Sequence, residues 1–140
     1  MCRPPGVPIL SRPRSAAVPA PATILVADDV SANRTLFTVY LRGAYAVEAV
    51  ETAEAAQARI EAGGVDLALL DISYGGGMSG VDLIRRLRAD PATAGVRAVA
   101  LTAHDSPEDR AAYLAAGFDG YLPKPVLKAQ MLAAVAEHLR

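Results

Sequence analysis

From Thr23 onward, the pattern of apolar and polar positions switches repeatedly between two types of segment. Short, nearly continuous apolar runs predict buried strands, and longer segments with apolar positions three or four apart predict amphipathic helices. The predicted strands cover residues 24–28, 44–50, 66–71, 96–101 and 120–122. The predicted helices cover residues 31–42, 53–62, a segment that opens at 79, 106–117 and 127–139.

Helix start and stop signals support these segments. Ser79 precedes Asp82 at capping-box spacing, and Ser106 precedes a proline at the first helical position, with Gly117 as the stop. The apolar stripes also predict which side chains face the core. For the first helix these are Leu36, Phe37, Tyr40 and Leu41; for the third, Val81, Ile84 and Leu87; for the last, Leu127, Met131, Val135 and Leu139.

Five successive strand–helix units predict an α/β fold with a doubly wound, five-stranded parallel sheet and five helices. The first, third and fourth strands are apolar on both faces, as expected when helices cover both sides of a parallel sheet. Ligands of such folds bind beyond the carboxyl ends of the strands. Polar and charged residues at that edge are therefore the candidates for a functional site.

Composition narrows the class of protein only modestly. The chain has 140 residues, 52% apolar content and a net charge of −1, which fits one globular domain and gives no reason to expect a nucleic-acid or membrane partner. No apolar run is long enough for a membrane span, and prolines interrupt any signal-peptide core, so we expect a cytoplasmic protein. Its one cysteine, Cys2, predicts a free thiol.

Residues 1–22 differ in composition from the rest of the chain. They contain six of the ten prolines and three arginines but no acidic residue, which leaves a net −4 for the remainder. Such a segment does not form a helix or a central strand. We expect residues 1–22 to be a disordered leader and residues 23–140 to be the folded domain.

Acidic residues end two of the predicted strands. Asp28 and Asp29 follow the first strand and Asp71 ends the third, while Thr102 ends the fourth and Lys124 follows the fifth. Clustered carboxylates repel one another unless a hard divalent cation and an ammonium group share the site. This combination indicates a Mg²⁺ site at which one carboxylate accepts a phosphoryl group. Taken alone, the first two acids are also compatible with simple capping of the helix that follows.

Lys124 is a more specific signal than the acids. The chain has 12 arginines but only two lysines, so a lysine at the site favours a compact ammonium over the planar fork of arginine. Prolines flank it on both sides, and the Lys124–Pro125 bond is a candidate cis peptide.

These motifs together resemble the CheY-like receiver domain of bacterial response regulators. The resemblance covers residues 24–140 and implies the strand order 2-1-3-4-5. The motifs that carry it, in chain order, are Ile24-Leu25-Val26-Ala27-Asp28-Asp29, Leu69-Leu70-Asp71, Leu101-Thr102-Ala103 and Tyr121-Leu122-Pro123-Lys124-Pro125.

The resemblance implies a role for each matching residue. Asp71 would accept a phosphoryl group from a phosphohistidine of a histidine kinase or a histidine phosphotransfer protein. Asp29, Asp71 and the backbone carbonyl of Ser73 would bind Mg²⁺ or Mn²⁺ directly, with Asp28 acting through water. Ser73 and His104 would tune the lifetime of the phosphoryl group. The resemblance places four further residues in phosphoryl binding and switching: Lys124, Thr102, Ala103 and Tyr121.

The resemblance also implies how such a domain signals. We expect a stand-alone regulator, monomeric or weakly dimeric, whose output is a protein contact through the face of the fourth helix, fifth strand and fifth helix. That face carries Ala111, Ala112, Ala115, Tyr121 and Lys128. No enzymatic activity is expected beyond Mg²⁺-dependent self-phosphorylation and autodephosphorylation.

One loop departs from the family pattern and leaves alternatives open. The usual Met-Pro step after the acceptor is absent, and the glycine-rich loop before Gly80 is one residue longer, which predicts a more flexible segment. The same loop contains the spacing Gly75-x-Gly77-x-x-Gly80 of dinucleotide-binding proteins. Two further alternatives are a pseudo-receiver that binds partners without phosphate and an aspartyl-phosphate hydrolase. The hydrolase lacks its second acid, because Ser73 occupies that position.

Overall fold

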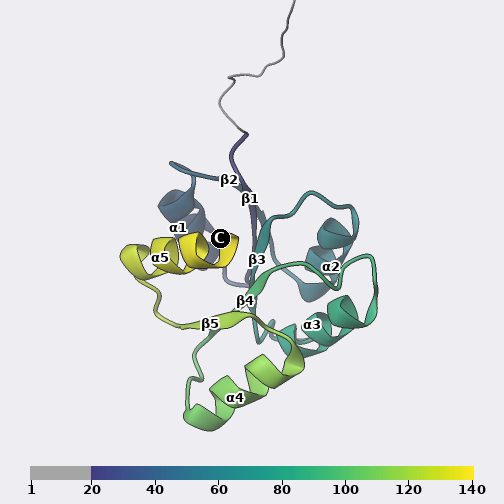
Figure 1. Cartoon of the computed structure of the whole chain (residues 1–140). Helices are drawn as coiled ribbons and strands as arrows, with labels where there is room; N and C mark the ends of the chain where they lie inside the picture. Colours follow the sequence, from purple (N-terminus) through teal and green to yellow (C-terminus); the bar gives the residue numbers. More distant parts are fainter. Residues whose placement is uncertain (1–19) are drawn as a thin grey trace, which may run out of the picture.

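Five parallel strands form one sheet in the order β2-β1-β3-β4-β5 (Figure 1). The computed structural model describes residues 20–140, so the predictions for Cys2 and for most of the 1–22 leader lie outside the described residues. The strands are β1 (Thr23–Ala27), β2 (Ala46–Val50), β3 (Leu67–Asp71), β4 (Ala98–Thr102) and β5 (Gly120–Pro123). The predicted α/β fold and strand order are confirmed.

Helices cover both faces of this sheet, and each face has its own core. The helices are α1 (Ser31–Leu41), α2 (Ala53–Glu61), α3 (Gly80–Ala89), α4 (Pro107–Ala116) and α5 (Lys128–Leu139). Figure 1 shows α1 and α5 on one side of the sheet and α2 and α3 on the other. Along β1, Ile24 and Val26 pack with side chains of α1 and α5, whereas Leu25 and Ala27 pack with those of α2 and α3. Because successive strand side chains alternate between faces, a strand buried on both sides is apolar throughout.

Local capping sets where α3 and α4 begin and where α4 ends. The Ser79 hydroxyl accepts a hydrogen bond from Asp82 N while the Asp82 carboxylate accepts one from Ser79 N, as the sequence predicts. The Ser106 hydroxyl caps α4 in the same way. Gly117 ends α4 with a φ of 125°, a backbone conformation that favours glycine.

Two of the predicted core side chains are in fact exposed. Leu36 on α1 is 42% exposed and Leu127 is 62% exposed. The contact face of α1 is narrower than its apolar stripe, with Phe37 and Leu41 fully inside the core. Leu127 precedes α5 as its N-cap residue, so its side chain does not continue the buried row of Met131 and Val135.

Several strand ends also differ from the sequence prediction. β2 begins at Ala46, because a turn in which Ala44 N and Tyr45 N donate to the Leu41 carbonyl precedes it. β4 begins at Ala98 rather than residue 96 and extends to Thr102. In the part of the chain from residue 20 onward, no helix combines the length and apolar character needed to cross a membrane.

Candidate functional site

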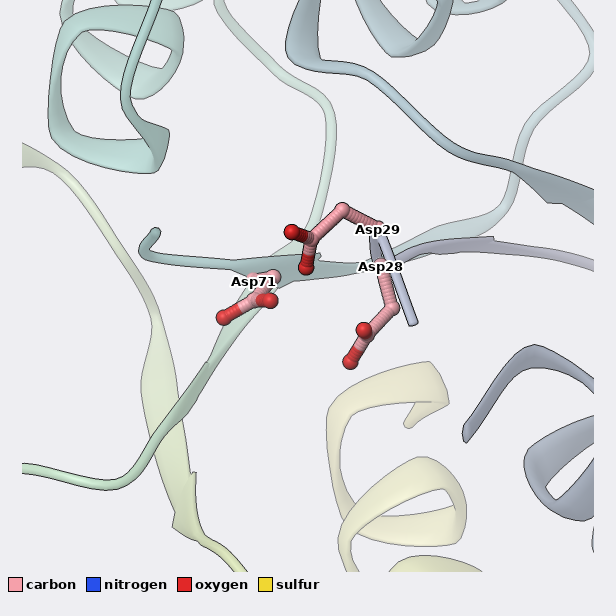
Figure 2. Close-up of side chains that lie close together, drawn as sticks. All are labelled: Asp28, Asp29 and Asp71. Carbon is pink, nitrogen blue, oxygen red and sulfur yellow. The ribbon is translucent and has the colours of Figure 1, made fainter. Parts of the chain in front are cut away.

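Three carboxylates meet at the carboxyl edge of the sheet. Asp28 and Asp29 directly follow β1, and Asp71 ends β3, the strand next to β1. One carboxylate oxygen of each lies within 4.8 Å of the other two, and Figure 2 shows the three side chains gathered at the strand ends. Asp28 and Asp71 are buried, whereas Asp29 is exposed. The strand register therefore brings Asp71 together with two acids that lie 42 and 43 positions before it in the sequence.

Lys124 connects two of these acids. Its Nζ lies 2.8 Å from Asp28 Oδ2 and 3.2 Å from Asp71 Oδ2. The Lys124–Pro125 peptide bond, the candidate named from the sequence, is cis. Burial lowers the pKa of the Lys124 ammonium, but the hydrogen bond to Asp28 and the charges of both acids outweigh this effect, so its pKa is raised.

Asp28 is fixed by further hydrogen bonds. Its Oδ1 accepts from Val30 N at 2.9 Å, and its Oδ2 accepts from Asn33 Nδ2 at 3.3 Å in addition to Lys124. Its backbone carbonyl accepts from the Arg34 guanidinium. A carboxylate with this many partners has little freedom to reorient, which suits a role in shaping the site.

Asp71 has fewer compensating partners. Besides Lys124, its carboxylate accepts only a 3.3 Å hydrogen bond from Ser73 N among the described residues. Burial raises the pKa of Asp71 above its ordinary value of 3.8; the charge of Lys124 opposes this shift and the charge of Asp28 adds to it. The ionised form of Asp71 is therefore under-stabilised by the protein alone.

The donor set fits a hard divalent cation. Three carboxylates supply the oxygen ligands that Mg²⁺ prefers, and the repulsion among them disfavours the site without added positive charge. Within residues 20–140, the Asp29 carboxylate accepts no hydrogen bond and forms no ion pair, so its oxygens remain open to a ligand. The under-stabilised charge of Asp71 points the same way.

A cavity of about 160 Å³ opens beside Asp71. The residues that line it are Asp71, Ile72, Ser73, Thr102, Ala103, His104 and Lys124. Six of these residues are among those to which the sequence assigns phosphoryl or metal chemistry, and their roles stay predictions. The cavity has room for a group the size of a phosphoryl beside the carboxylate.

The two predicted switch residues have partners that the sequence did not indicate. The Thr102 hydroxyl, which is buried, hydrogen-bonds with the Tyr113 hydroxyl at 2.9 Å. Tyr121 is half-buried, and the Arg110 guanidinium lies 5.3 Å from the centre of its ring. Tyr113 lies near the middle of α4, and its spacing from Thr102 carries no signal that would have placed it at the site.

The glycine-rich loop between β3 and α3 is anchored rather than free. Tyr74 is buried, and its hydroxyl donates to the Ala27 carbonyl at 3.4 Å, while Met78 N donates to the Glu54 carboxylate at 3.2 Å. Burial, followed by the charges of Asp71 and Asp28, raises the pKa of the Tyr74 phenol well above its ordinary range. These anchors take the place of the missing proline in holding the loop near the acids.

Gly80, the last glycine of the dinucleotide-like spacing, has a packing role. A Cβ at this position would lie 2.2 Å from the Asp71 carbonyl oxygen and 2.9 Å from the Ile72 Cα. The absence of a side chain therefore lets α3 begin directly against the end of β3. The dinucleotide hypothesis receives no support from this geometry.

The family model for the response regulator receiver domain matches residues 24–136. The chain belongs to this family. The match covers the five strands, except for Thr23, and most of the last helix, and it places the acid cluster and Lys124 within a response regulator receiver domain.

Curated relatives support the same assignment. The receiver domain is 36% identical over 102 residues to the two-component response regulator PhoP of Pseudomonas aeruginosa, covering 73% of this chain and 44% of that protein. It is 32% identical over 116 residues to the gliding motility regulatory protein of Myxococcus xanthus, covering 83% of this chain and 15% of that protein. The chain thus spans less than half the length of each of these two relatives.

Solved structures show the same architecture. Chemotaxis protein CheY4 of Vibrio cholerae superposes with a TM-score of 0.79 at 25% identity, covering 86% of this chain and all of that one. The receiver domain of a sensor histidine kinase from Pseudomonas aeruginosa superposes with a TM-score of 0.77 at 30% identity, covering 86% and 98%. That second structure has a magnesium ion coordinated in its active-site cleft.

Proposed function

We propose that this receiver domain accepts a phosphoryl group on Asp71 from a phosphohistidine of a histidine kinase or a histidine phosphotransfer protein. The observation that carries the proposal is the setting of Asp71. Its buried carboxylate lines a cavity of phosphoryl size and lies 3.2 Å from the only cation among the residues that line it. Membership of the receiver family supports the same chemistry.

The residues around Asp71 would hold a Mg²⁺ or Mn²⁺ ion. Asp29 and Asp71 would be direct ligands together with the Ser73 carbonyl, and Asp28 would act through water. When bound, the cation supplies positive charge that offsets the oxygens of the incoming phosphoryl group. The repulsion among the three acids is the observation that supports a cation here.

In the transfer itself, an Asp71 carboxylate oxygen forms the new P–O bond as the P–N bond of the donor phosphohistidine breaks. The electron pair of the broken bond stays on the imidazole nitrogen. Catalysis of such a transfer is mainly positioning and charge stabilisation, which Lys124 provides from its place between Asp28 and Asp71. Ser73 and His104, both at the cavity, are proposed to set how fast water removes the group again.

The phosphohistidine donor is proposed to dock beside α1. A groove of about 400 Å³ adjoins Lys124, and its lining includes the exposed apolar side chains Leu36 and Leu127. A donor must bring its phosphoryl group to Asp71 while burying apolar surface elsewhere, and this groove is continuous with the site through Lys124. The apolar exposure that contradicted the helix predictions thus has a function in this proposal.

The phosphorylated domain is proposed to signal by protein contact through the α4–β5–α5 face. Ala111, Ala112 and Ala115 are all exposed on α4, and Lys128 is exposed at the start of α5. Small side chains let a partner backbone approach closely, which favours a partner helix.

Intact-mass measurement after incubation with acetyl phosphate and Mg²⁺ tests the proposal. We expect a labile gain of one phosphoryl group in the wild type and none in Asp71→Asn. Asp90→Asn, a matched change at the end of α3, should label like the wild type, because Asp90 lies away from the cavity. No gain in the wild type, together with no Mg²⁺ binding, would favour a pseudo-receiver that binds partners without phosphate.

A further inference from the structure

The hydroxyl of Thr102 is already fully engaged in the structure. Its Oγ1 accepts a hydrogen bond from His104 N at 2.9 Å and lies 2.9 Å from the Tyr113 hydroxyl, which in turn donates to the His104 carbonyl at 3.0 Å. Thr102 Oγ1 also lies 3.0 Å from the His104 carbonyl oxygen. With one proton on each hydroxyl, the network closes in two ways: Thr102 donates to Tyr113 and Tyr113 to the His104 carbonyl, or Tyr113 donates to Thr102 and Thr102 to that carbonyl. The Thr102 proton is then unavailable to a ligand in the adjoining cavity.

Thr102 nevertheless lines the cavity beside Asp71. A phosphoryl oxygen in that cavity would compete for the threonine proton with its acceptor in this network, which is the Tyr113 hydroxyl or the His104 carbonyl. Both hydroxyl groups are buried, with Thr102 1% and Tyr113 5% exposed, so water does not readily replace either partner. The Thr102 hydroxyl therefore donates either within this network or to a phosphoryl oxygen, but not to both.

We propose that Tyr113 is a positioning residue that holds the Thr102 hydroxyl in its unphosphorylated arrangement and is displaced when Asp71 carries a phosphoryl group. This inference rests on the proposed function of Asp71 and Thr102. It adds a residue of α4 to the residues that govern phosphoryl binding. Because Tyr113 holds the Thr102 hydroxyl in the network, it lowers the affinity of the cavity for a phosphoryl group.

The position of Tyr113 also connects the cavity to α4. Tyr113 is the buried side chain of this helix, whereas Ala111, Ala112 and Leu114 beside it are exposed. Its ring belongs to the core between the sheet and α3. Loss of the Thr102 bond removes the hydrogen bond that ties the middle of α4 to the end of β4, so the state of Asp71 is transmitted to the helix that carries the proposed output face.

Binding of beryllium trifluoride, a tetrahedral mimic of a carboxylate-bound phosphoryl group, tests the proposal in saturating Mg²⁺. Tyr113→Phe removes only the hydroxyl, and we expect it to tighten beryllium trifluoride binding roughly 2- to 10-fold, the value of one net hydrogen bond. Affinity for Mg²⁺ alone should not change, because neither residue is an expected ligand. Tyr45→Phe, at the amino end of β2, is the matched control and should bind like the wild type.

A double variant distinguishes a positioning role of Tyr113 from a general loosening of the fold. In Thr102→Val, which cannot donate, Tyr113→Phe should no longer change beryllium trifluoride affinity. An equal or weaker affinity in Tyr113→Phe than in the wild type would overturn the role of Tyr113 while leaving the proposed function intact. A wild type that neither binds beryllium trifluoride nor gains a phosphoryl group would overturn both.

A measurement on the wild type covers the case in which the variant folds poorly. The His104 amide donates to Thr102 Oγ1, so its NMR resonance and those of the Tyr113 ring should shift when beryllium trifluoride saturates the site. Unchanged resonances at both residues in the saturated protein would contradict the displacement.

Discussion

At the scale of single residues, Asp71 is held in a state that suits its proposed role as phosphoryl acceptor but lowers the stability of the fold. Its carboxylate is buried beside Asp28, and Lys124 is shared between the two acids. The raised pKa of Asp71 shows that the folded protein disfavours its ionised form. Functional sites commonly keep such destabilising charges, because a bound ligand offsets the unfavourable charge.

Asp71→Asn is accordingly expected to stabilise the metal-free protein at neutral pH, by about 0.5–2 kcal/mol. Because the folded-state pKa lies above the ordinary value of 3.8, wild-type stability falls as pH rises through the window between the two. The advantage of the variant should therefore be full above that window and vanish below pH 3.8.

Urea unfolding of both proteins across this pH range, without divalent cations, measures the effect. Glu137→Gln, a change at an exposed acid, is the control and should have the same stability as the wild type at every pH. A variant less stable than the wild type at neutral pH would show that Lys124 compensates Asp71 in full.

At the scale of elements, the start of α3 is set by how closely it approaches β3. Gly80 N donates to the Ile72 carbonyl at 2.9 Å, and the Gly80 Cα faces the backbone of Asp71 and Ile72. The capping box of Ser79 and Asp82 then fixes the first turn. The proposed acceptor Asp71 and the start of α3 are therefore held together by backbone contacts.

Gly80→Ala is expected to destabilise the fold by about 2–3 kcal/mol, because its Cβ meets backbone atoms that cannot rotate away. Gly43→Ala is the matched control: a Cβ there has nothing within 4 Å, so stability should change by less than about 0.5 kcal/mol. Chemical unfolding of the two variants compares them directly. Equal stabilities would mean that α3 can shift away from β3 at little cost.

At the scale of the whole molecule, the residues of the site lie at the ends of strands that are packed against a core on each face of the sheet. β1 and β3 carry the acids and sit at the centre of the sheet, with β5 supplying Lys124 from near its edge. A ligand that binds the acids therefore contacts segments from β1 to the loop after β5. Its binding energy should stabilise the whole fold.

Mg²⁺ is thus expected to raise the unfolding temperature of the wild type, with about 2.7 kcal/mol of stabilisation at 100 times its dissociation constant. Asp29→Asn should lose most of this effect, because Asp29 is the acid with open oxygens. Thermal unfolding with and without Mg²⁺ gives the result, and Asp90→Asn should respond like the wild type. A full Mg²⁺ response in Asp29→Asn would remove Asp29 from the ligand set.

The sequence by itself determined the class of fold and the location of the site. Strand and helix periodicities are local, so the five units followed from neighbouring residues, although several ends moved by up to two positions. Asp28, Asp29 and Asp71 were predicted to meet because each follows a strand and parallel strands end at one edge. That inference needs only the direction of the strands, not their exact packing.

Only the tertiary structure decided which side chains meet across elements. The exposure of Leu36 and Leu127 depends on how α1 sits against the loop after β5, which no periodicity encodes. The bond between Thr102 and Tyr113 depends on the rotation and register of α4 over the sheet. Contacts of this kind join residues on separate elements, so they are fixed by the global packing of the core rather than by any local run of sequence.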